Sequence, residues 1–384
     1  MKILFIQYEF NQFSDSVSLA YHCSAGIPAA LRECGHEVDC VLMPHTARLE
    51  LLASQGDYDF ALIDVVHGLC RMDSNTHQIP IPPLLTLKRR GIPIAGILIE
   101  TLFHDNGGHA DVMPQLRLRA ILQSMLWLDA MIAFDRHDAD VLRSMGVRAL
   151  WSPFSSSDPV PAADVNVSNE LIFVGSMYDK RQRFLRDAGL GNRITAGRIT
   201  YPGEFTEVHR QVLALAAAND ATLKEDLFEN YRQLKHAALG HYAQFLKHLP
   251  LIINLPSIFR GIACRTVESL WLGRVVVSPR PRHSEERRLQ DSVPHALYQY
   301  DEDEPASFAQ AIQAALDSKV TREQFEALDT YLRGSVFDPR TQAANFVDFI
   351  SGAQDSEAIE ASYFRSDAAA RPTPSLEGIP SRRG

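Results

Sequence analysis

Residues 2–8 read KILFIQY, a short and mostly apolar run that is typical of a buried β-strand. Similar runs recur along the first part of the chain, each separated from the next by a longer segment. The runs are apolar throughout and do not alternate, as expected of strands that helices cover on both faces. Strands in alternation with helices predict βαβ units and a parallel sheet. The other runs are EVDCVLM (37–43), FALIDVV (60–66), IPIAGILI (92–99) and AMIAF (130–134).

A change of composition divides the chain. Residues 152–169 are rich in Ser, Pro and Asp and have no periodicity, which is typical of an interdomain linker. A second α/β block follows. We therefore predict two doubly wound α/β domains, residues 1–155 and 170–351, joined by a linker at 156–169. The apolar runs of the second block are ELIFVG (170–175), PLIINLP (250–256) and RVVVSP (274–279).

Two segments outside this strand pattern have their own character. Residues from about 205 to 248 are mostly helical in pattern, and they predict a helical insertion in the second domain. Residues 352–384 lose aliphatic side chains and gain Pro, Ser and Arg. That composition predicts a disordered tail.

Composition restricts the classes of partner and compartment. The chain has 384 residues, of which 46% are hydrophobic, and a formal net charge of -9. A net negative charge does not favour binding to nucleic acid or to an anionic membrane surface. The five cysteines are scattered, no apolar run approaches the length of a membrane span, and residues 1–10 do not read as a signal peptide. We therefore expect a soluble cytoplasmic protein.

A small-residue turn followed by basic residues marks one candidate site. Gly175 and Ser176 follow the strand at 170–175, and Lys180 and Arg181 fall in the first turns of the next predicted helix. Exposed backbone N–H groups and a helix N-terminus favour an anion such as phosphate, and basic side chains would neutralise a diphosphate. The alternative interpretation is a helix with a solvated basic face.

A second candidate lies in CRTVESLWLG, a short predicted helix between two buried strands. Arg265 and Glu268 are three residues apart and share a face in its first turns. The glutamate can accept hydrogen bonds from ribose hydroxyls, and the arginine can meet a phosphate. The alternative interpretation is a surface ion pair that contributes a few tenths of a kcal/mol.

Four longer segments, which together cover about half of the chain, carry a resemblance to a known family. They are FVGSMYDKRQRFL (173–185), INLPSIFRGIACRTVESLWLGRVVVSP (253–279), LYQYDEDEPASFAQAIQAAL (297–316) and DAMIAFDRHDADVLRSMGVRALWSPFSSSD (129–158). Taken in order, the first three resemble the donor-binding domain of GT-B glycosyltransferases, in particular the CgeB-like group of glycosyl group 1 enzymes. The fourth, from the first domain, is similar to that family's last N-domain strand, its helix and its exit to the linker.

The resemblance implies the GT-B fold, in which two Rossmann-like doubly wound domains face a central cleft. It also implies roles for the residues that match the family by position. Arg181, with Lys180 as its neighbour, would bind the donor diphosphate, and Arg265 would bind the phosphate or the sugar. Glu268 would bind the donor ribose, and the loop amides around Gly261 would face the sugar.

The catalytic group of such an enzyme is expected from the first domain. The loop after the fourth strand carries His104, Asp105 and His109 beside two glycines. Asp105 or His104 is the candidate general base or electrostatic partner, and a solvated polar loop is the alternative. Asp15 and His22, after the first strand, rank lower because helix capping explains that segment equally well.

No metal or other cofactor is expected. The D-x-D within DEDE (301–304) precedes Pro305 and a helical pattern, where acidic residues fit the helix dipole. The histidines also lack the spacing of a metal site. The nucleotide sugar would be a substrate.

The sequence therefore predicts a metal-independent glycosyltransferase that moves a sugar from a UDP-, GDP- or dTDP-sugar to an unknown small-molecule, glycan or protein acceptor. Many retaining members of the GT-B class have a glutamate eight positions before the ribose glutamate, and this chain has Arg260 there. Two alternatives stay open at this point. One is a sugar-nucleotide epimerase, and the other is a non-catalytic protein of GT-B fold that binds a nucleotide sugar or a partner.

Overall fold

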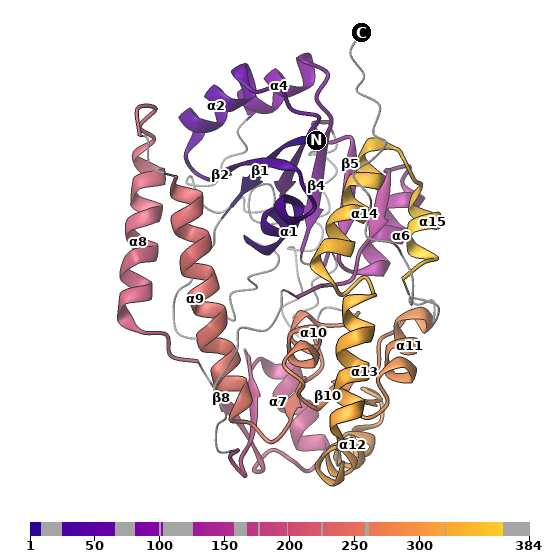
Figure 1. The fold of residues 1–384 in the computed structure, drawn as a ribbon. Coiled ribbons are helices and arrows are strands. Elements are labelled where there is room, and N and C mark those ends of the chain that lie inside the picture. The colour runs from indigo at the N-terminus through magenta and orange to yellow at the C-terminus, as the bar shows by residue number, and fades with distance from the viewer. Residues whose placement is uncertain are drawn as a thin grey trace.

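The structure, a computed structural model, has two lobes that are each built on parallel strands (Figure 1). A six-stranded sheet forms the first lobe, and two smaller sheets form the second. The described residues are 1–8, 25–65, 81–99, 101–102, 126–156, 167–175, 177–197, 199–223, 226–257, 261–318 and 320–363.

The sheet of the first lobe contains all five strands predicted from the apolar runs, followed by a short sixth strand. Its strands lie in the order β2-β1-β3-β4-β5-β6, and every neighbouring pair is parallel. All residues of β3, β4 and β5 are buried, which explains why these runs do not alternate. The strands are β1 (Lys2–Gln7), β2 (Glu37–Leu42), β3 (Phe60–Asp64), β4 (Ile94–Leu98), β5 (Ala130–Ala133) and β6 (Ala149–Trp151).

Helices connect these strands and cover the sheet. The helix before β2 ends at Gly35, whose φ of 84° lies in the left-handed region that glycine adopts without strain. Two other helices, α2 and α4, pack against one another over one face of the sheet (Figure 1). The helices of the first lobe are α1 (Ile27–Glu33), α2 (Thr46–Gln55), α4 (Ile81–Arg89) and α6 (Arg136–Ser144).

The second lobe is also an all-parallel arrangement within its described residues. Its strands pair as β11-β10-β9 and β7-β8, and β7 contacts β9. The predicted α/β class with two parallel-sheet lobes is therefore confirmed. The strands are β7 (Leu171–Val174), β8 (Ile194–Gly197), β9 (Ile252–Ile253), β10 (Val276–Pro279) and β11 (Leu297–Tyr300), and the connecting helices are α7 (Asp179–Asp187), α10 (Cys264–Trp271), α11 (Ser284–Ser292) and α12 (Pro305–Asp317).

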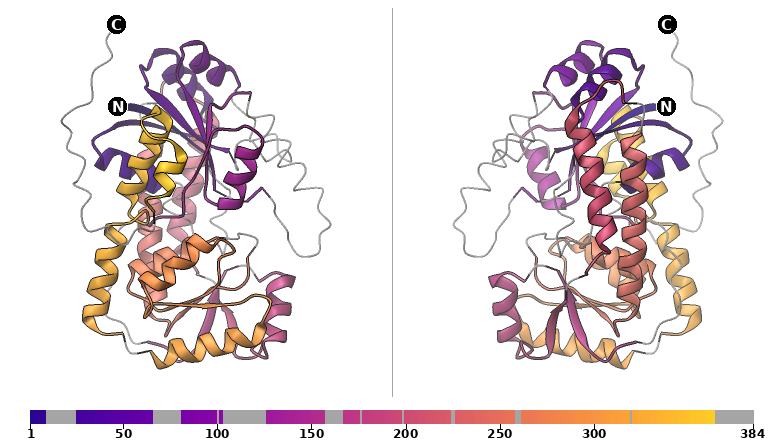
Figure 2. Two further views of the ribbon diagram at one scale, coloured as in Figure 1. Left: turned by 90° about the vertical axis from the view of Figure 1, so that its right-hand side faces the viewer. Right: turned by 90° about the vertical axis from the view of Figure 1, so that its left-hand side faces the viewer.

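Two long helices, α8 (Gly203–Ala218) and α9 (Leu227–Lys247), occupy the region predicted to be a helical insertion. They form a hairpin that reaches from the second lobe to the first (Figures 1 and 2). At its tip, Asn219 Oδ1 accepts hydrogen bonds from Ala47 N at 2.6 Å and from Thr46 Oγ1 at 3.2 Å. The Phe5 and Phe228 rings meet edge-on at 6.3 Å. The hairpin is thus fixed to the first lobe at the start of α2.

The last helices return to the first lobe. After α13 (Arg322–Arg333), α14 (Pro339–Ser351) packs on α1, and α15 (Ser356–Glu360) packs on β6. Arg143 of α6 also pairs with Glu360 of α15.

This return corrects the prediction of a disordered tail from residue 352, because residues 352–363 are folded. Ile359 and Tyr363 are 1% and 3% exposed, and the Tyr363 hydroxyl donates to Trp151 O at 2.7 Å. Residues 364–384 lie outside the described part of the chain. The domain boundaries at 155 and 170 stay a prediction.

Candidate functional site

A pocket of about 170 Å³ lies at the carboxyl ends of β9 and β10, beside the N-terminus of α10. Ligands of parallel α/β sheets bind at this end of the strands, where helix N-termini offer unpaired N–H groups. Ala263 is the N-cap residue of α10 and its side chain makes no capping hydrogen bond. The lining includes Arg181, Arg265, Arg280, Glu302, Asn254, Ser257, Ser278, Gly261, Ala263 and Cys264.

Arg181 is held in place by its own neighbours. Its Nε donates to Pro256 O at 2.9 Å, and the Tyr178 hydroxyl donates to the same oxygen at 2.9 Å. The guanidinium carbon lies 4.4 Å from the centre of the Tyr178 ring and 4.9 Å from that of Phe173. Burial lowers the pKa of Arg181, and the nearby Arg265 lowers it further. The side chain is therefore a positioned cation in a partly desolvated site.

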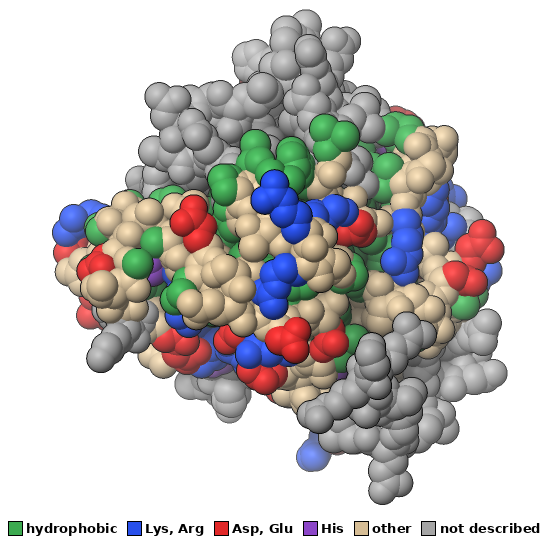
Figure 3. Space-filling view, turned by 90° about the horizontal axis from the view of Figure 1, so that it is seen from above, with side chains coloured by type: hydrophobic (Ala, Val, Ile, Leu, Met, Phe, Trp, Pro, Cys, Tyr) green, Lys and Arg blue, Asp and Glu red, His purple; other side chains and the backbone are tan. Residues whose placement is uncertain are grey.

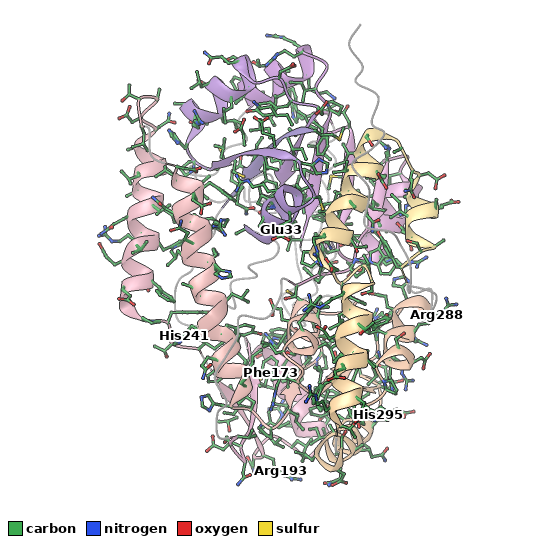
Figure 4. The ribbon with its side chains drawn as sticks, viewed as in Figure 1. Glu33, Phe173, Arg193, His241, Arg288 and His295 are labelled. Carbon is green, nitrogen blue, oxygen red and sulfur yellow. The ribbon has the colours of Figure 1, made fainter. Side chains whose placement is uncertain are left out.

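Arg265, in the first turn of α10, lies against the same aromatic ring. Its guanidinium carbon is 5.5 Å from the centre of the Phe173 ring, and its Nη1 donates to Asn254 Oδ1 at 3.2 Å. The Nε atom is buried and has no hydrogen-bond partner among the described residues. Phe173 lies inside the second lobe (Figure 4). Two like charges around one ring repel one another, so the arrangement favours an anion between or beside them.

Gly175 makes room for Arg265. Its φ is 149°, a conformation that side chains rarely adopt. A Cβ atom added there would lie 2.9 Å from Phe173 Cζ and 3.1 Å from Arg265 Nη2. The glycine predicted at this turn is thus required for the packing of the arginine.

Glu268 lies one turn after Arg265 and behind the pocket. It is 5% exposed, and its Oε1 accepts a hydrogen bond from Cys264 Sγ at 3.1 Å. Burial raises the pKa of Glu268, while the Cys264 thiol, Arg265 and the Tyr242 hydroxyl lower it. The alternative of a surface ion pair is wrong because the carboxyl group is buried. The ribose contact stays a prediction.

Lys180 is paired rather than aimed at the pocket. Its Nζ lies 3.3 Å from Glu302 Oε2, and both side chains are about one-third exposed, so the pair contributes little stability. Glu302, from the acidic segment before α12, lines the pocket. The acidic segment ahead of Pro305 does precede a helix, as expected. Of this pair, Glu302 is among the residues that line the pocket and Lys180 is not.

The sequence reasoning missed several lining residues, among them three polar residues at strand ends. Asn254 follows β9 directly, Ser278 lies in β10, and Arg280 follows β10. Asn254 Nδ2 donates to Thr266 Oγ1 at 2.8 Å, which ties the strand end to α10. Their positions could have predicted them, because each residue lies at the carboxyl end of an apolar run or just after it.

Several predicted residues lie outside the described residues. They are Ser176, His104, Asp105, His109, Asp15, His22 and Arg260. Within the described ranges, no group of three or more His, Cys, Asp or Glu side chains could hold a metal ion.

Two further observations concern the predicted absence of a membrane-spanning segment and the distribution of surface charge. No helix in the part of the chain that the structure describes combines the length and apolar character needed to cross a membrane. Basic and acidic side chains are interspersed on the face of the first lobe seen in Figure 3.

Comparison with known proteins gives structural likeness only. No family model matches the chain, and no curated protein matches it in sequence. The structure of S. aureus TarM in complex with UDP is similar over 80% of this chain, with 10% identity and a TM-score of 0.43. This chain covers 58% of that TarM chain.

Two other proteins are similar over nearly their whole length. Phytolacca americana UGT2, complexed with UDP-2fluoro-glucose and pterostilbene, has 11% identity and a TM-score of 0.39 over 91% of this chain and 99% of its own. UDP-GlcNAc 2-epimerase from Methanocaldococcus jannaschii has 10% identity and a TM-score of 0.39 over 87% and 99%. Because these identities and TM-scores are low, the fold class is assigned from the sheet topology. A function has to be argued from the residues of the site.

Proposed function

We propose that this chain is a glycosyltransferase that moves a sugar from a nucleotide diphosphate sugar to an acceptor, without an obligatory metal ion. The observation that supports this most is the placement of Arg181 and Arg265 around the Phe173 ring, in a pocket at the carboxyl ends of parallel strands. Two fixed guanidinium groups beside a helix N-terminus match the charge of a diphosphate.

The proposed chemistry follows from the departure of the diphosphate. As the bond between the sugar and the diphosphate breaks, negative charge grows on the leaving oxygen, and cations already in place stabilise it. Arg181 and Arg265 supply those charges, and the first amides of α10 add a partial positive charge. Glu268 is proposed to accept hydrogen bonds from the donor ribose, and the amides around Gly261 to face the sugar.

The acceptor is proposed to bind on the side of the first lobe, and Asp105 or His104 to act as general base. A general base must lie within hydrogen-bonding reach of the acceptor hydroxyl, directly or through one water. The acceptor would be a small molecule, a glycan or a protein.

A binding measurement comes first among the tests. Isothermal titration calorimetry with UDP, GDP and dTDP should show binding of at least one of them. A protein that binds none of the three would contradict the proposal.

A turnover measurement then separates the enzyme from its alternatives. The matching nucleotide sugar is incubated with a panel of acceptors, with and without EDTA, and the products are separated by chromatography. Release of the nucleoside diphosphate with a glycosylated acceptor, undiminished by EDTA, is the expected result. Conversion of the donor sugar without acceptor would indicate an epimerase, and binding without turnover would indicate a non-catalytic protein. Asp105→Asn should retain donor binding and lose turnover.

A further inference from the structure

Tyr242 of helix α9, in the helical hairpin, lies near Arg265 and Glu268 of the candidate donor site. Tyr242 is 2% exposed and lies near the end of α9 that enters the second lobe. The other end of the hairpin is fixed to the first lobe through Asn219 and Asp220, the latter accepting a hydrogen bond from His45 Nε2 at 3.2 Å. The tyrosine therefore belongs to a hairpin whose other end is hydrogen-bonded to the first lobe.

Two buried polar atoms in this region lack partners. The Tyr242 hydroxyl and Arg265 Nε both have no hydrogen-bond partner among the described residues, although each is shielded from solvent. The hydroxyl nevertheless lies close enough to interact with Arg265 and with the Glu268 carboxyl. A buried polar group without a partner costs about 1–3 kcal/mol, so a small movement that satisfies both atoms would be favourable.

We propose that Tyr242 is a positioning residue for the donor site, linking Arg265 and Glu268 through its hydroxyl when the donor binds. A tyrosine hydroxyl can accept from the Arg265 Nε–H and donate to the Glu268 carboxylate at the same time. This fixes the arginine toward the phosphate and the carboxylate toward the ribose. The inference rests on the proposed function, because it concerns the same donor site.

Among the described residues, three titratable groups face Glu268. Cys264 and Arg265 face it from its own helix, and Tyr242 faces it from α9. Burial raises the pKa of Glu268, and each of these three neighbours lowers it. Removal of the Tyr242 hydroxyl should therefore raise the pKa of Glu268 further. An ionised Glu268 accepts hydrogen bonds from ribose and a protonated one does so less well, so the loss of affinity on acidification should begin at a higher pH.

The test uses Tyr242→Phe in the full chain, with Tyr331→Phe as the matched control. Tyr331, on α13, also has a buried hydroxyl without a hydrogen-bond partner among the described residues, and it does not line the pocket. The affinity for UDP and for pyrophosphate, which has no ribose, is measured by calorimetry across a series of pH values. Tyr242→Phe should bind UDP roughly tenfold more weakly than wild type, with the acid fall in affinity moved to higher pH. The pH dependence of pyrophosphate affinity should be the same in Tyr242→Phe as in wild type. The pH dependence of UDP affinity in Tyr331→Phe should also match that of wild type.

A double variant keeps the role testable in a second way. If the hydroxyl acts partly through the carboxylate, the losses in Tyr242→Phe with Glu268→Gln should be clearly less than additive. Additive losses, an unchanged UDP profile, or a uniform loss at every pH with a lower melting temperature would overturn the role of Tyr242 alone. Failure of the wild-type protein to bind UDP, GDP or dTDP would instead overturn the proposed function, and the role of Tyr242 with it.

Discussion

The guanidinium carbons of Arg181 and Arg265 lie 4.9 and 5.5 Å from the centre of one phenyl ring, that of Phe173. The two arginines are far apart in the sequence and come from the first turns of different helices, α7 and α10. Each is oriented by a separate acceptor, Pro256 O for one and Asn254 Oδ1 for the other. The ring and these acceptors therefore hold both guanidinium groups in place, and the first prediction depends on that placement.

Replacement of either arginine by alanine should weaken UDP binding by at least about tenfold, since hydrogen bonds to charged groups contribute about 1.5–3 kcal/mol. Calorimetry at two salt concentrations is the measurement, and the wild-type affinity should fall more steeply with salt than that of Arg181→Ala or Arg265→Ala. Arg193→Ala is the control, because Arg193 is exposed at the far end of the second lobe (Figure 4). An equal loss in the control would contradict the assignment.

Gly175→Ala should lower both stability and UDP affinity, because the added Cβ would press on Phe173 and on Arg265 Nη2. Gly189→Ala is a matched comparison, since Gly189 also has a positive φ, of 69°, but an added Cβ there would have no atom within 4 Å. Both variants should have lower melting temperatures, through backbone strain. Only Gly175→Ala should also bind UDP more weakly. Equal UDP affinities in the two variants would show that the turn does not set the position of Arg265.

Glu268→Gln should stabilise the fold at neutral pH while weakening UDP binding. Burial raises the pKa of this carboxyl group in the folded state above the ordinary glutamate pKa of 4.5. The free energy of unfolding therefore falls as the pH rises from 4.5 toward the raised pKa, because the unfolded chain loses the proton more readily than the folded chain. Glutamine is never charged, and it should therefore have the higher melting temperature at neutral pH. The difference should vanish below pH 4.5, where wild-type Glu268 is protonated in both states. Thermal unfolding across pH is the measurement, with the exposed Glu33→Gln as control (Figure 4).

The hairpin tip can be tested at Asn219, which ends α8 with a φ of 54° and accepts hydrogen bonds from Thr46 and Ala47. Asn219→Gly keeps the backbone conformation but loses the side-chain acceptor, so it should lower the free energy of unfolding by about 1–2 kcal/mol. Asn219→Ala should lose about 1 kcal/mol more, from backbone strain. Urea unfolding measures both. A glycine variant as stable as wild type would show that this contact between the lobes contributes nothing.

The C-terminal return can be tested by ending the chain after residue 352. This removes Ile359, Glu360 and Tyr363, of which Glu360 accepts from Trp151 N at 2.8 Å and pairs with Arg143. The shortened chain should melt several degrees lower, because buried apolar side chains and hydrogen bonds on β6 are lost. Tyr363→Phe, which removes only the hydroxyl bonded to Trp151 O, should show a smaller decrease. An unchanged melting temperature for the shortened chain would mean that these contacts do not stabilise the first lobe.

The sequence by itself determined the local features of this protein. The apolar runs predicted the strands of the first sheet, because a strand covered on both faces must be apolar at every position. The place of Gly175 at the end of β7, and of Arg265 and Glu268 in the first turns of α10, followed from strand ends and helical periodicity. These features depend on residues that are close in the sequence, so they can be predicted without knowledge of the tertiary structure.

The tertiary structure alone decided which distant residues meet. It placed Arg181 and Arg265 on one ring, buried Glu268 beside Tyr242, brought Arg280 and Asn254 to the pocket, and returned α14 and α15 to the first lobe. These contacts depend on the order of strands in each sheet and on the path of the connections between them, and residue spacing does not encode either one. The burial of Glu268 is the clearest example, because the side chain that covers it from α9 is Tyr242, 26 positions earlier in the chain.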